Sequence, residues 1–195
     1  NTTASNNTAV GYQALYTSTN GPNTAVGSLA LNSNSSGYDN TAVGRDALTA
    51  NTTGIRNSAF GDKTLDANTT GDSNTAYGAY SLGANTTGSD NVAVGYKASY
   101  VATTSNNCTV VGENAGYSYT GNGNQAFFGE YAGHNATGAN NTMIGQQAGW
   151  QITTGEKNTI LGRYNGNQGG LDIRTSNNNI VLSDGDGNPR LHIDS

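Results

Sequence analysis

One glycine recurs along this chain every 16 or 17 residues, and this period constrains the fold more than any other feature. The residue before each of these glycines is always apolar. A fixed period of this length is typical of a solenoid, in which each unit forms one coil and the coils stack into a rod. We call these residues the repeat glycines, and they divide the chain into ten units: Gly11, Gly27, Gly44, Gly61, Gly78, Gly95, Gly112, Gly129, Gly145 and Gly162.

Each unit contains the string Asn-Thr-Ala-Val-Gly or a close variant, best seen at residues 40–44. Thr and Val are β-branched and favour a strand, and the glycine permits a sharp bend after it. An Ala-Leu pair and a polar turn such as residues 51–54 complete the unit. We therefore predict an all-β parallel solenoid of ten coils, with the asparagine four residues before each repeat glycine stacked as a ladder.

Two positions exchange volume along the chain. The inner row, two residues before each repeat glycine, changes from small to large: Ala9, Ala25, Ala42, Ala59, Ala76, Ala93, Val110, Phe127, Met143 and Ile160. The opposite row, four residues after it, changes from large to small: Leu15, Leu31, Leu48, Leu65, Leu82, Ser99, Gly116, Gly133, Gly149 and Gly166. Because buried cores resist a net change of volume, we predict that the two rows fill one buried space, within a coil or across a chain interface.

The apolar content is low for a self-sufficient coil, at 33% of the residues. So few apolar side chains offset little of the entropy cost of ordering a chain, which favours a core shared between coils and between chains. Strand alternation also places the apolar residue before each repeat glycine on the face opposite the inner row. We call these residues the outer row: Val10, Val26, Val43, Phe60, Tyr77, Val94, Val111, Phe128, Ile144 and Leu161. Because both faces of the strand carry apolar or small residues, we predict an inner coil core and a second buried face against sister chains in a homotrimer.

The repeat stops after Gly162, and a glycine-rich stretch follows. Residues 180–182 and 191–193 alternate in polarity and flank residues 184–189, a pattern typical of a hairpin. We expect a repeat domain over residues 1–166 and a short β-hairpin segment over 167–195 that leads into a further C-terminal part.

The repeat string, at residues 7–15 and 40–48, resembles the repeat region of phage tail fibres and the head of trimeric autotransporter adhesins. The resemblance covers about residues 6–166 and implies a trimeric left-handed parallel β-roll with a role in attachment. The segment 179–191 looks more like the phage fibres, in which such hairpins often precede a chaperone domain.

The charge pattern argues against several classes of partner. The net charge is −5, no basic stripe is present, and no apolar run approaches the length of a membrane helix. We therefore expect neither nucleic-acid binding nor membrane insertion. No catalytic or cofactor-binding set can be assembled from two isolated histidines, so we expect neither an enzyme nor a cofactor.

Only one stretch has metal-ligand spacing. Asp184, Asp186 and Asn188 match the opening of a calcium loop, but the closing position falls on Ser195 instead of glutamate, so a hairpin turn is the favoured interpretation. Cys108 replaces a ladder asparagine and is expected to be a small packed residue. Acceptor tripeptides for N-glycosylation begin at Asn51, Asn68, Asn85 and Asn135.

Eleven tyrosines leave two interpretations open, recognition of a glycan or protein and packing in turns or between chains. The favoured function is a stiff trimeric spacer or presenting surface in a phage tail fibre, located on the virion and directed at a host receptor or glycan. A bacterial surface adhesin that binds host matrix or glycans and a self-assembling extracellular filament are the alternatives.

Overall fold

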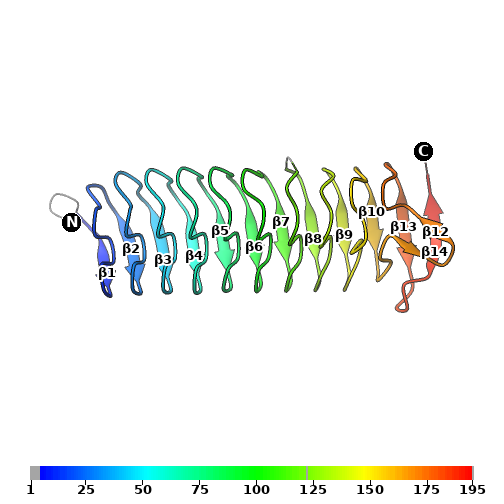
Figure 1. The fold of residues 1–195 in the computed structure, drawn as a ribbon, viewed down its shortest axis with the longest axis horizontal. Helices are drawn as coiled ribbons and strands as arrows, with labels where there is room; N and C mark the ends of the chain where they lie inside the picture. Colours follow the sequence, from blue (N-terminus) through cyan, green and yellow to red (C-terminus); the bar gives the residue numbers. More distant parts are fainter. Residues whose placement is uncertain (1–4, 122, 195) are drawn as a thin grey trace.

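The computed structural model describes residues 5–121 and 123–194, which form one straight rod of stacked coils with the two chain ends at opposite ends of the rod (Figure 1). No helix occurs among these residues, and hence none that could span a membrane. The strands are β1 (Thr8–Val10), β2 (Asn23–Val26), β3 (Asn40–Val43), β4 (Ser58–Phe60), β5 (Thr75–Tyr77), β6 (Val92–Val94), β7 (Thr109–Val111), β8 (Ala126–Phe128), β9 (Thr142–Ile144), β10 (Thr159–Leu161), β11 (Asn167–Gln168), β12 (Leu171–Asp172), β13 (Ile180–Ser183) and β14 (Pro189–Ile193). The prediction of an all-β parallel solenoid of about ten coils is confirmed.

Strands β1 to β10 pair in chain order and in parallel, each one coil after the last. Equivalent residues of successive units lie side by side, as with Ala42 against Ala59 and Val43 against Phe60. A one-residue slip would turn the buried inner row outward, so burial of one face of the strand fixes this register.

The repeat glycines occupy backbone that other residues would strain. Gly11 has a φ of 135°, and a Cβ placed on it would lie 2.5 Å from the carbonyl oxygen of Gly27. The same contact recurs from each repeat glycine to the next as far as Gly162. Glycine is therefore required twice over, by conformation and by the close approach of successive coils.

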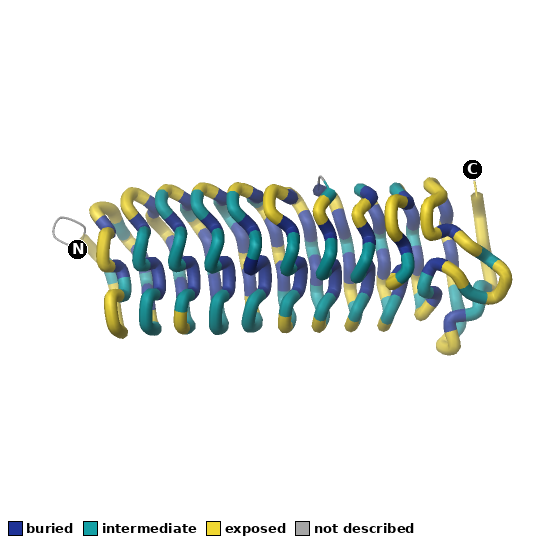
Figure 2. The backbone as a smooth tube through the Cα atoms, in the orientation of Figure 1, coloured by how far each residue is buried: buried dark blue, intermediate teal, exposed yellow. Residues whose placement is uncertain are grey.

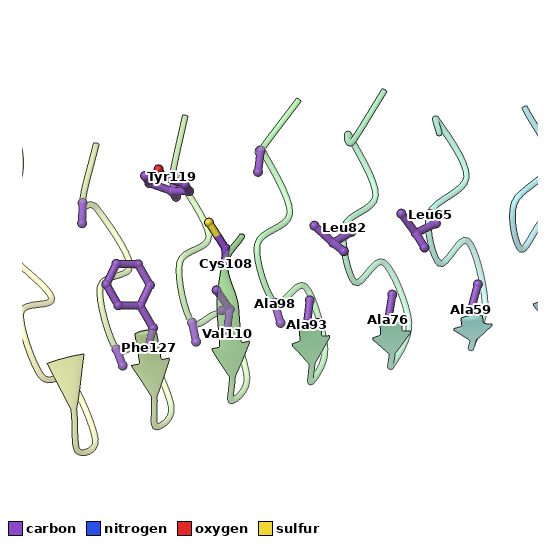
Figure 3. Packing of buried hydrophobic residues seen from close by; sticks show 14 of the residues in the cluster. Ala59, Leu65, Ala76, Leu82, Ala93, Ala98, Cys108, Val110, Tyr119 and Phe127 are labelled. Carbon is purple, nitrogen blue, oxygen red and sulfur yellow. The ribbon is translucent and has the colours of Figure 1, made fainter. Parts of the chain in front are cut away.

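The inner and opposite rows share one interior space, as predicted. From Ala25 onward the inner row is buried, and so are the leucines of the opposite row (Figure 2). Leu65 and Leu82 face the strands that carry Ala59 and Ala76, whereas the ring of Phe127 reaches across from its own strand (Figure 3). A Cβ on Gly133 would lie 2.6 Å from that ring, and one on Gly149 would meet Met143. The exchange of volume therefore operates within the chain.

The last unit departs from this rule. A Cβ on Gly166 would meet Ile152 of the preceding coil instead of Ile160 of its own strand. Gly116 is mixed, because its Cβ would lie 3.1 Å from Phe127 of the next coil and 3.4 Å from Val110 of its own unit. The exchange within one unit is therefore strict for Phe127 and Met143, whereas at Gly166 the space is taken by a neighbouring coil.

The sheet continues past the repeat. β13 pairs in parallel with β10 and places Ser183 where another repeat glycine would stand, and β14 then pairs antiparallel with β13. β11 and β12 form a separate antiparallel pair. The sheet therefore crosses the boundary expected at residues 166 and 167.

Candidate interaction surfaces

Two polar ladders run through the interior and hold the coils in register. In the first, the backbone N–H of Asn57 donates to Oδ1 of Asn40 (2.9 Å), and Asn74 repeats this bond to Asn57 (2.9 Å). The side-chain amide of Asn57 also donates to the carbonyl oxygen of Gly71 (2.8 Å). The expected ladder is present, and Cys108 and Gln125 occupy two of its positions.

The second ladder was missed by the sequence argument, which placed these residues in a polar turn. Asn51, Asn68 and Asn85 are 0% exposed, and the amide of each donates to Oδ1 of the ladder residue one coil earlier, beginning with Asn34 (2.8–2.9 Å). The regular 17-residue spacing was the available signal. Because these three amides are enclosed, the glycosylation tripeptides that begin at them are inaccessible in the folded chain. Asn135 is only partly buried and donates to the carbonyl oxygen of Trp150 (3.0 Å).

The outer row forms an apolar band along the sheet. Four of its members are half-buried, and the others are exposed, up to 61% at Tyr77. Phe60 stacks on Tyr77 with ring centroids 5.7 Å apart. β13 extends the band with Ile180 and Leu182. A contiguous exposed apolar band of this kind marks an interaction surface.

Tyrosines are divided between packing and exposure, so the packing interpretation is confirmed for some of them and recognition stays a prediction for the exposed ones. Tyr119 and Tyr164 are fully buried, and burial raises the pKa of Tyr119 to about 12. Tyr12, Tyr16 and Tyr96 are exposed.

An aromatic cluster lies on the coil segments just after the repeat glycines. The ring of Tyr117 stacks between Tyr100 (5.4 Å between centroids) and His134 (5.2 Å). Tyr80 meets Tyr96 and Tyr100 edge-on, at 6.1 and 6.3 Å. We call these five residues the tyrosine cluster. Trp150 lies outside it and contacts Tyr131 (6.3 Å).

Lys97 is embedded in the tyrosine cluster, and sequence reasoning did not single it out. Its Nζ lies between 5.2 and 6.0 Å from the ring centroids of four tyrosines. The ammonium group donates a hydrogen bond to Tyr96, which is the main cause that raises the pKa of Lys97, so Lys97 stays charged at neutral pH. Cation–π attraction of this kind stabilises the cation against the ring faces.

The candidate metal residues form a turn. Oδ1 of Asp184 accepts hydrogen bonds from the backbone N–H groups of Asp186 (3.1 Å) and Asn188 (2.9 Å), and its other oxygen pairs with Arg190. These bonds, that of Asn188 first, hold the pKa of Asp184 below its ordinary value. The Asp184 oxygens serve the turn, which supports the hairpin interpretation, and Ser195 lies outside the described residues.

The remaining reactive groups are isolated. Cys108 is buried, and burial raises the pKa of its thiol. His192 bonds Asn179 through Nε2 (2.9 Å), and His134 belongs to the tyrosine cluster. Within residues 5–121 and 123–194, no three His, Cys, Asp or Glu side chains gather as metal ligands would.

In comparisons with known proteins, no family model, curated protein or solved structure matches this chain. The fold and the two surfaces, the outer row and the tyrosine cluster, are therefore the basis for a proposal.

Proposed function

We propose that this chain is a stiff spacer segment of a trimeric attachment fibre, of the kind found in phage tail fibres. The observation that carries the proposal is the outer row, which presents an exposed or half-buried apolar side chain on every coil. An apolar band that runs the length of a rod suits a partner with the same period, and a second and third copy of the chain supply it.

The role of such a segment is mechanical. Parallel strands bonded coil to coil, with two internal amide ladders, resist bending and protease attack because few backbone groups are free. The fibre would hold a receptor-binding end away from the particle that carries it. The sequence resemblance to fibre repeats supports the same role.

The mass of the purified chain in solution tests this proposal. Sedimentation equilibrium is expected to give three times the chain mass of 19.9 kDa. Val94→Glu together with Val111→Glu places charges in the middle of the outer row and is expected to yield monomers, because burying an unpaired carboxylate is costly. Thr104→Glu, at an exposed turn, is the matched control and should leave the trimer intact. A monomeric parent chain would overturn the proposal.

A second candidate, the head of a bacterial surface adhesin, is favoured by the tyrosine cluster, since a partly exposed aromatic patch suits binding as well as spacing. Cell binding by the isolated rod separates the two roles. A spacer does not attach to cells without the rest of its fibre, whereas an adhesin head does.

A further inference from the structure

The tyrosine cluster is built into the rod. Gly83 lies beneath it, and a Cβ on Gly83 would lie 2.8 Å from the ring of Tyr100. Gly83 does not have the positive φ of the repeat glycines, so space for the ring, and not backbone conformation, accounts for glycine there. The stacked contacts from Tyr100 to His134 then fix the rings across three coils.

Lys97 gives this surface its one positive charge. It is the only lysine or arginine between Lys63 and Lys157. The four rings around its ammonium group hold it in place, so its N–H donors and the neighbouring phenol groups form a preorganised set.

Acceptors lie on the coils that follow. The backbone N–H of Asn114 donates to the carbonyl oxygen of Tyr96 (2.9 Å), and that of Tyr131 donates to the carbonyl oxygen of Glu113 (2.9 Å). Glu113 and Glu130 therefore continue the column that begins at Tyr96, and Glu130 accepts a hydrogen bond from Gln146 (2.9 Å). Two carboxylates and an amide thus follow Tyr96 along the rod axis, and the carboxylates lie on the same coils as the stacked rings of Tyr117 and His134.

From this arrangement we infer that the tyrosine cluster binds a neutral, hydroxyl-rich oligosaccharide that runs along the rod. Sugar hydroxyls both donate and accept, which matches carboxylates beside an ammonium and phenols, and sugar C–H groups pack on aromatic carbon. Coils repeat about every 4.8 Å, which is close to the length of one pyranose residue in an extended chain. The flanking carboxylates and the net charge of −5 oppose an acidic glycan.

This inference goes beyond the spacer role. It rests on the proposed function in one respect: in the trimer, the tyrosine cluster must remain outside the interface that the outer row forms. Binding is tested by titrating the chain with cellohexaose, maltohexaose and mannohexaose, with a hyaluronan hexasaccharide as the acidic comparison, followed by NMR shifts or calorimetry. We expect binding to at least one neutral hexasaccharide and none to hyaluronan. Tyr117→Ala and Lys97→Gln should each weaken it by about tenfold.

Tyr12→Ala is the matched control, because Tyr12 follows a repeat glycine in the first unit, away from the cluster, and is 70% exposed. It should leave the affinity unchanged. Tyr117→Phe keeps the stack if Tyr117→Ala disturbs the fold, and circular dichroism checks each variant. No binding to any neutral hexasaccharide, stronger binding to hyaluronan, or equal loss in Tyr12→Ala would overturn the inference. A trimer that fails to bind sinks this inference alone, and a binding monomer sinks the proposed function alone.

Discussion

At the scale of single residues, the interior is decided by pairs of positions. Position 133 is equivalent to Leu65 and Leu82 of earlier units. The phenyl ring of Phe127 occupies the volume that a leucine side chain would need there. Leu65 and Leu82 adopt φ values of 51° and 50°, close to the 59° of Gly133. Backbone conformation therefore does not exclude leucine at position 133, and the ring does.

The pair can be exchanged as a unit. Phe127→Ala alone should cost about 3–5 kcal/mol of unfolding free energy because it leaves a cavity, and Gly133→Leu alone should be destabilising because it overpacks the coil. The double variant restores the alanine and leucine pairing of the early units. We expect it to be at least about 1 kcal/mol more stable than the sum of the single effects, measured by chemical denaturation. Additive losses would show that the two positions do not share a space.

At the scale of elements, the asparagine ladders bond each coil to the next. Asn68 donates to Asn51 (2.9 Å) and to the carbonyl oxygen of Gly71 (3.1 Å), and its own Oδ1 accepts from Asn85 (2.9 Å). A buried ladder residue therefore satisfies groups on three coil segments at once.

Removing one ladder side chain leaves its buried partners unpaired. Asn68→Ala should lower the free energy of unfolding by about 1–3 kcal/mol, measured by denaturant melting. Thr70→Ala, two residues further on and exposed, should change it by less than about 0.5 kcal/mol. Equal effects of the two substitutions would argue that the ladder adds nothing beyond helping to fill the interior.

The turn between β13 and β14 should respond to acid. The pKa of Asp184 lies below its ordinary value of 3.8, so its charged form is favoured in the folded turn. The stability that ionised Asp184 contributes to the turn is fully present above pH 3.8. It is lost as the pH falls through the lowered pKa of the folded state. We expect the amides of Asp186 and Asn188 to lose hydrogen-exchange protection in that acidic window.

Asp184→Asn provides the comparison for this turn. The amide keeps an acceptor oxygen but carries no charge, so protection at Asp186 and Asn188 should become independent of acid. A parent chain whose turn protection does not change below pH 3.8 would contradict the assignment.

At the scale of the whole molecule, the rod has two interior designs that meet at the sixth unit. There the inner row has Ala93, the opposite row has Ser99, and Ala102 stands where the second ladder would continue. Among the described residues, Asn85 Oδ1 and Ser99 Oγ are buried side-chain atoms without a hydrogen-bond partner. The two rows thus have their smallest pair of side chains in the sixth unit, with one unpaired polar atom in it and one in the unit before it, so the rod should open there first.

Filling this coil tests the idea. Ser99 has a φ of 53°, within the range of the leucines in the same row, so Ser99→Leu fits the backbone. It should raise the free energy of unfolding by about 1–2 kcal/mol and slow amide exchange in the sixth unit. Ser99→Ala removes only the unpaired hydroxyl and should give a smaller gain. Destabilisation by leucine would show that the coil is already full.

The sequence was sufficient for the coil. The repeat glycines, the β-branched strand residues and the volume exchange between the inner and opposite rows each depend on local conformation or on spacing by one period, and both can be read from a single chain. The first ladder followed for the same reason, since identical residues one coil apart must meet.

Only the tertiary structure decided which polar residues face inward. Asn51 and its equivalents look like turn residues because their neighbours are threonine and glycine, yet the coil closes over them. Around Lys97, Tyr80 shares the offset of the lysine from its repeat glycine, and Tyr100 and Tyr117 share another offset. The repeat therefore predicts each column, but not that the two columns meet around one ammonium group. Stacking of identical coils places equivalent positions of successive units in contact. Contacts between different positions of the unit depend on the path of the backbone within each coil, which the repeat alone does not specify.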